Sequence, residues 1–145
     1  MAGTLLVSGQ EWVLDQMLVY LNTSGACWVG LMQESSDPLP ASQIGAGITE
    51  IDPLGDGTGS GYLRQYCSGW VKTLGGDPYI SGPAVSWTVS GSWQSVNGYF
   101  VATASGLSDA SAIWAQPFPS GSIGDKTDGK EIIVVPRYEQ TDYSE

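Results

Sequence analysis

The chain of 145 residues contains no histidine, and this absence excludes two groups of functional sites. Ser-His-Asp and Cys-His catalysis need an imidazole to move a proton, and histidine-ligated metal sites need its ring nitrogens. The chain has two cysteines, Cys27 and Cys67, whereas an all-cysteine zinc site takes four thiolates. The sequence therefore predicts no metal and no other cofactor, and it points away from an enzyme.

Basic residues are also scarce, with 5 Lys and Arg against 15 Asp and Glu and a net charge of −10. Nucleic-acid binding requires Lys and Arg to neutralise phosphates, and an anionic membrane surface attracts the same side chains. Neither partner is expected. The longest apolar helical segment contains Glu11 and Asp15 and is too short to span a membrane. Residues 1–7 lack the basic residues of a signal peptide.

Two cysteines are too few for a disulfide framework. One interpretation is that Cys27 and Cys67 are free thiols in the interior, where cysteine commonly lies. The other is a disulfide, either within the chain or between chains. Both residues lie near the ends of predicted elements, where a thiol can reach the surface.

What the chain does contain is 20 glycines, six tryptophans and 41% hydrophobic residues. This composition fits short strands joined by tight turns, and the length fits one domain over residues 1–145. We predict a mainly β fold, a small antiparallel β-sandwich or barrel-like domain with one N-terminal α-helix.

The strongest pattern lies between Val85 and Trp114. Large apolar and small polar residues alternate over 85–89, the period of a strand with one buried face. Two further β-rich runs cover 98–104 and 112–116, at roughly ten-residue spacing. This spacing predicts a meander, and 130–135 reads as the last strand.

Ser8 and Glu11 have the spacing of a capping box, which predicts a helix over about residues 9–22. Val13, Met17 and Leu21 would form its packing face. Trp28 lies in a strand, 27–32, that is apolar on both sides, so helix and strand are candidates for packing or for a subunit interface. The β-rich region spans about 26–135, and an acidic tail follows at 136–145.

Carboxylates and aromatic side chains are the remaining candidates for chemistry. Asp52, Asp56, Asp77, Asp125 and Asp128 lie at turns, where aspartate usually binds backbone amides. A glycosidase pair or a calcium loop is the alternative. A larger aromatic set is expected to pack in the core or an interface, with a sugar-binding surface as the alternative: Trp87, Trp93, Tyr99 and Trp114.

The order of these motifs resembles the small tailed-phage proteins usually labelled phage tail fibre proteins. Their pattern is an N-terminal helix, a strand like L-x-V-G-L-F-T, a Gly-rich loop before G-Y-x-R, a tryptophan, and then a meander. The corresponding segments here are 11–21, 27–32, 61–64, Trp70 and 85–101. The sequence departs from the pattern at 32–34, where it reads Met-Gln-Glu.

This resemblance implies a non-enzymatic structural protein of a virion, made in the host cytoplasm and located in the tail or on the outer particle surface. The expected role is a tail-fibre or baseplate-attached module in host attachment or particle assembly. Its expected partners are other virion proteins, copies of itself with a trimer first, and a host surface glycan. A capsid decoration protein is the alternative, and a carbohydrate-binding module or glycan hydrolase is the alternative of another class. No catalytic residue is carried over.

Overall fold

A computed structural model describes residues 6–35, 48–51, 61–75, 78–105 and 112–139. Within these ranges the chain forms one α-helix, α1 (Val7–Leu21), one short 3-10 helix, η1 (Ser120–Ser122), and eleven strands. The strands are β1 (Trp28–Met32), β2 (Gln65–Tyr66), β3 (Val71–Thr73), β4 (Tyr79–Ser81), β5 (Val85–Thr88), β6 (Ser92–Val96), β7 (Gly98–Ala102), β8 (Ala112–Pro117), β9 (Gly124–Thr127), β10 (Glu131–Val134) and β11 (Arg137–Glu139). All of their pairings are antiparallel. The predicted mainly β fold with one N-terminal helix is therefore confirmed.

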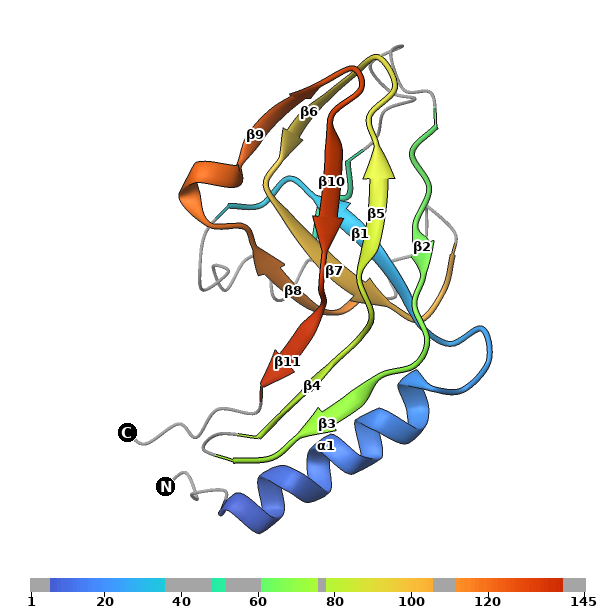
Figure 1. Cartoon of the computed structure of the whole chain (residues 1–145), viewed down its shortest axis with the longest axis vertical. Helices are drawn as coiled ribbons and strands as arrows, with labels where there is room; N and C mark the ends of the chain where they lie inside the picture. Colours follow the sequence, from blue (N-terminus) through green and yellow to red (C-terminus); the bar gives the residue numbers. More distant parts are fainter. Residues whose placement is uncertain (1–5, 36–47, 52–60, 76–77, 106–111, 140–145) are drawn as a thin grey trace.

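Two layers of strands enclose the main core in the upper part of Figure 1. One layer has the order β2-β1-β7-β8, and the other is the pair β10-β5. Buried and exposed residues alternate along β5 and β10, so each strand turns one face inward. Their buried residues belong to the same hydrophobic cluster as those of β1 and β7: Val85, Trp87, Ile132 and Val134 with Val29, Leu31 and Val101. This is a sandwich, and the described strands close no barrel.

A three-stranded sheet, β11-β4-β3, forms the lower part of the molecule, and α1 covers it (Figure 1). The Asp15 carboxylate of α1 accepts a hydrogen bond from Lys72 Nζ of β3 at 2.6 Å. Where the helix ends, Asn22 Oδ1 accepts the backbone N–H of Trp70 at 2.8 Å. The helix is therefore attached to this sheet by one polar contact at its middle and one at its C-terminal end, as well as by its apolar face.

The N-terminus of α1 differs from the predicted capping box. The helix begins at Val7, its N-cap residue is Leu6, and no side chain caps it. Ser8 consequently lies inside the first turn, and the amide of Gln10 donates to the Leu6 carbonyl. The helix starts earlier than expected because the backbone hydrogen bond from Gln10 to Leu6 already belongs to the first turn. Leu6 has no side chain that could cap the helix.

The predicted meander is correct only for β7 and β8, which pair with each other. β5 pairs instead with β10, where Ile132 lies opposite Trp87, and β6 pairs with β9. The alternating burial of β10 matches that of β5, so the two strands complete one face across a long stretch of sequence. The predicted acidic tail is also wrong at its start, because Arg137–Glu139 forms β11 against β4.

Candidate functional site: an association surface on the helix and a buried polar cluster

The aromatic set proposed from the sequence lies largely inside the protein. Three of its members are buried and the fourth is half-buried: Trp87, Trp93, Tyr99 and Trp114. The ring of Trp93 meets the edge of Tyr62 at a centroid distance of 5.6 Å, and Trp114 packs on Trp70 at 5.5 Å. A sugar-binding platform needs exposed ring faces, so these four residues do not form one.

Two of the candidate aspartates are described and both bind backbone amides: Asp128 lies at a turn as predicted, whereas Asp125 lies in β9. Asp125 Oδ1 accepts the N–H of Ser95 at 2.9 Å, and Asp128 Oδ1 accepts the N–H of Gly91 at 2.8 Å. Ser95 has a positive φ of 53°, so the first of these bonds stabilises a backbone conformation that serine seldom adopts. Three other aspartates, Asp52, Asp56 and Asp77, lie outside the described residues. Within the described part of the chain, no group of three or more carboxylates and thiols is placed to hold a metal ion.

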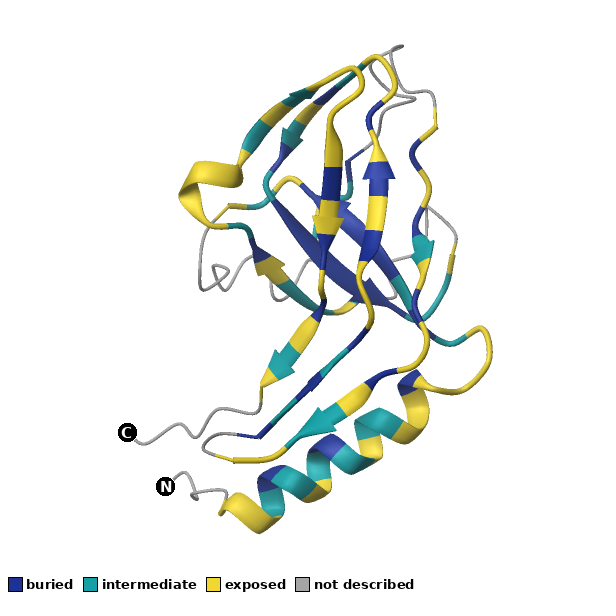
Figure 2. Cartoon of the chain, viewed as in Figure 1, coloured by how far each residue is buried: buried dark blue, intermediate teal, exposed yellow. Residues whose placement is uncertain are grey.

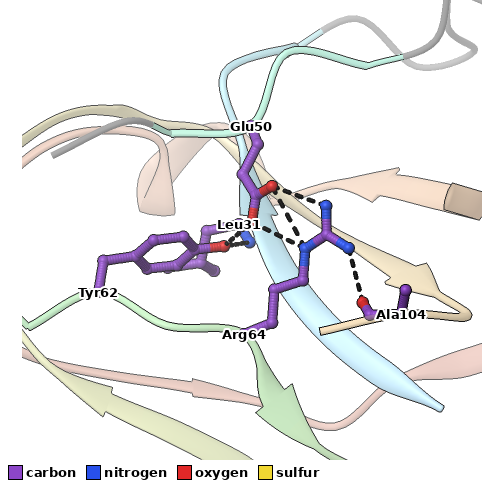
Figure 3. Close-up of polar contacts among 5 residues, drawn as sticks. All are labelled: Leu31, Glu50, Tyr62, Arg64 and Ala104. Carbon is purple, nitrogen blue, oxygen red and sulfur yellow. Dashed lines mark hydrogen bonds and ion pairs between the residues drawn. The ribbon is translucent and has the colours of Figure 1, made fainter. Parts of the chain in front are cut away.

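A buried polar cluster that the sequence did not predict lies beside β1, and its contacts are drawn in Figure 3. Arg64 donates to both carboxylate oxygens of Glu50, with Nη2 to Oε2 at 2.8 Å and Nε to Oε1 at 3.0 Å. The side chains are 2% and 11% exposed, respectively. Arg64 Nη1 also donates to the Ala104 carbonyl at 2.7 Å, and its guanidinium lies 5.0 Å from the centre of the Phe100 ring. The positive charge is therefore paired, hydrogen bonded and stacked.

Tyr62 connects this ion pair to the sheet. Its hydroxyl donates to Glu50 Oε1 at 2.7 Å and accepts the amide N–H of Leu31 at 2.9 Å. Burial, with a smaller contribution from the Glu50 charge, raises the pKa of Tyr62 well above its usual range. The phenol therefore stays protonated and takes the place of a strand carbonyl for the Leu31 amide of β1. These contacts give the cluster a structural role, because they hold Glu50, Tyr62 and Arg64 together beside β1.

One signal in the sequence points to this cluster. Tyr62 and Arg64 are two residues apart in an extended segment, which places both side chains on the same side. The buried partner, Glu50, lies in the short β-like stretch 48–51 and pairs with Met32 across an isolated bridge. Nothing in the sequence indicates that these two segments meet at the edge of β1.

The inner face of α1 packs against β3 and β4 and against the main core. Leu21 is buried, and Met17 packs against the main core, whereas Val13 is only half-buried. Trp28 lies outside this face, half-buried at the start of β1, where its Nε1 donates to the Gly25 carbonyl at 3.1 Å. Of the residues proposed from the sequence, Val13, Met17 and Leu21 thus lie at the helix–sheet contact. Trp28 lies apart from them, at the start of β1 in the upper sheet.

The outer face of α1 is apolar as well, and we call it the outer helix surface: Trp12, Gln16, Val19 and Tyr20. All four are exposed, with Trp12 at 64% and Val19 at 72%. Positions seven residues apart lie nearly on one line of a helix, opposite the buried Leu14. Figure 2 shows exposed residues recurring along the length of α1. A solvent-facing helix usually carries charge on this side, whereas none of these four residues is charged.

Cys27 and Cys67 are both buried, and their thiols are free. Neither thiol reaches the surface, because the residues beside the ends of β1 and β2 close the core rather than leave it. The two residues lie opposite one another, and the Cys67 amide donates to the Cys27 carbonyl at 3.0 Å. A bond to another chain would require either thiol to leave the core.

Within the described ranges, no helix has both the length and the apolar character needed to cross a membrane. Comparisons with protein-family models, with curated proteins and with solved structures find no match for this chain. The function of the site is therefore inferred from its own geometry and from the pattern of the sequence.

Proposed function

We propose that this protein is a non-enzymatic structural component of a tailed-phage virion, a tail-fibre or baseplate-attached module used in host attachment or particle assembly. The outer helix surface is the observation that carries the proposal. Burying one large apolar side chain stabilises a contact by about 1.5–3 kcal/mol, and this surface offers Trp12 and Val19 together. An assembly component needs such a contact surface in addition to its own core. The order of motifs resembles that of the tailed-phage proteins, and this resemblance is the reason for proposing that the contact is made in a phage particle.

The first partner of the outer helix surface is a second copy of the chain, in a symmetric oligomer with a trimer as the first expectation. With a net charge of −10, copies repel one another wherever acidic faces approach. Trp12, Gln16, Val19 and Tyr20 carry no charge, and of the two acidic residues beside them, Glu11 and Asp15, the second is paired with Lys72, so little like charge meets at this surface. Other virion proteins and a host surface glycan remain the further proposed partners.

A capsid decoration protein is the second candidate, and the same observation favours it. An exposed apolar helix face can dock on a capsid as readily as on a tail. The two roles differ in location, because the chain would lie on the head in one case and on the tail in the other.

Association is tested with the double variant Trp12→Ser and Val19→Ser, measured by light scattering at micromolar concentration. The wild-type chain is expected to form an oligomer and the variant a monomer. The melting temperature of the variant monomer should stay near that of a dissociated wild-type chain, because neither side chain is buried in the fold. Ile133→Ser is the matched control, since Ile133 is 61% exposed on β10 and lies away from the helix. A monomeric wild-type chain, or equal oligomers in all three proteins, would contradict the proposed surface.

Location is tested on purified tailed-phage particles made in cells that express the chain from the phage genome. Gold-labelled antibodies against the chain should decorate the tail in electron micrographs, and mass spectrometry should find the chain in the particles. Label on the head would favour the decoration role. Absence of the chain from intact particles would contradict both virion roles.

A further inference from the structure

Cys27 and Cys67 form a cross-strand pair. β1 and β2 are antiparallel, with Trp28 opposite Tyr66, so the next register position places Cys27 directly opposite Cys67. The hydrogen bond from the Cys67 amide to the Cys27 carbonyl, at 3.0 Å, continues the ladder to this position. Directly opposed residues have their side chains on the same face of a sheet, with Cα atoms about 4.5–5.5 Å apart. That spacing lies within the range of about 4.4–6.8 Å found for disulfides.

The two thiols lie next to each other in a closely packed part of the core. The residues are 0% and 1% exposed, each thiol shifts the pKa of the other, and Cys67 Sγ donates a weak hydrogen bond to the Pro83 carbonyl at 3.8 Å. The backbone of Gly82 closes the space, because a Cβ added there would lie 2.8 Å from Cys67 Sγ and 2.9 Å from the Trp70 ring. Among the residues that the structure describes, Cys27 is the cysteine that lies opposite Cys67 in this closely packed position.

We propose that Cys27 and Cys67 are the two halves of an intrachain disulfide, formed when the chain folds in the presence of a small-molecule disulfide such as oxidised glutathione. The bond would join the strand that follows α1 to the segment that leads into β3. It would also close a loop of about forty residues, and such a closure restricts the unfolded chain more than the folded one.

The disulfide would form by thiol–disulfide exchange between the two cysteines and oxidised glutathione. The thiolate of either cysteine can start the exchange while the chain is still open; written for Cys67, it attacks one sulfur of glutathione disulfide and releases one glutathione. Cys27 then loses its proton and displaces the second glutathione from Cys67. Two protein thiols are oxidised and one glutathione disulfide is reduced to two thiols, which take up the two protons.

Because both sulfurs are buried, the exchange takes place before the fold closes, and the experiment starts from the unfolded chain. Full-length reduced protein is unfolded in denaturant, refolded by dilution into a mixture of reduced and oxidised glutathione, and alkylated. The monomer is then denatured again and digested with trypsin without reductant. Trypsin cleaves after Lys and Arg, and Arg64 and Lys72 are the first such residues, so Cys27 lies in peptide 1–64 and Cys67 in peptide 65–72.

The expected product is one species in which peptides 1–64 and 65–72 are linked, and which separates into both when reductant is added. The linked protein should melt about 10 °C above the reduced protein, given its loop length. Cys67→Ala is the control and should give an alkylated or glutathione-bound Cys27 with no linked peptide. The proposal is overturned if the wild-type protein yields two alkylated cysteines, stable glutathione adducts, or a dimer joined through cysteine. It is also overturned if the linked monomer melts no higher than the reduced one, because the native register would then not accommodate the bond.

Discussion

Replacing Glu50 with Gln keeps the shape of the side chain and removes its charge, so it tests the buried polar cluster with little change in volume. In the native protein, Arg64 is bound by both oxygens of Glu50, and its side chain is 2% exposed. In Glu50→Gln the guanidinium keeps its charge and its burial but loses its counter-ion. The new amide NH₂ also faces the donors of Arg64, and an amide nitrogen cannot accept their hydrogen bonds.

The size of the effect follows from the burial of the pair. Removing one partner of a buried ion pair costs about 3–5 kcal/mol, because the other charge remains without compensation. Glu50 is 11% exposed and water can partly solvate the site, so we expect the lower value, about 3 kcal/mol. For a chain of this length, that loss lowers the melting temperature by about 10 °C.

The chain offers a matched control, because Glu139 also pairs with an arginine. Arg137 Nη2 lies 3.0 Å from Glu139 Oε1, but these side chains are 50% and 38% exposed. An exposed pair contributes about 0–1 kcal/mol, so Glu139→Gln should change the melting temperature by only a few degrees. Both variants remove one carboxylate, which cancels any effect of net charge. The free energy of unfolding would be measured by urea titration of each protein. Equal losses in Glu50→Gln and Glu139→Gln would refute the reasoning.

Three further predictions concern packing and protonation. Met17→Asp places a charge where α1 packs on the core, so urea titration should show a loss of at least about 2 kcal/mol, and an unchanged midpoint would contradict the packing. Gly30→Ala brings a Cβ into the phenylalanine ring of β7 and should cost about 1–3 kcal/mol, whereas Gly121→Ala has open space and should cost nothing. Equal thermal melting of these two variants would contradict the close approach. Burial raises the pKa of Tyr62 and of Tyr99. Unfolded tyrosines release protons near about pH 10 while the folded protein retains them, so the free energy of unfolding should fall as the pH rises above about 10; a flat profile between about pH 9 and 11 would contradict this.

Local patterns in the sequence were enough to predict individual elements. The alternation over 85–89 predicted β5, because a strand with one buried face must place apolar side chains at every second position. The apolar repeat around Met17 predicted α1, although the first turn extends to Val7 without the expected cap. Gly91, between β5 and β6, lies at φ 78°, a conformation that glycine adopts without steric cost.

Partners across long stretches of sequence could not be predicted in the same way. Every strand with one apolar face fits every other such strand by period alone, so nothing local selected β10 rather than β7 as the partner of β5. The same limit applied to Glu50 and Arg64, since an acid and a base carry no signal for each other until the fold brings them within 3 Å.

The sequence by itself determined the fold class, the absence of imidazole chemistry and the strong negative charge, because these depend on composition and on local periodicity. Only the tertiary structure decided whether each candidate side chain is buried or exposed. It placed the aromatic set in the core, brought the two cysteines face to face, and left Trp12 and Val19 on the surface. The physical reason is that burial depends on which elements pack together, and that choice is made by the free energy of the whole core rather than by any one segment.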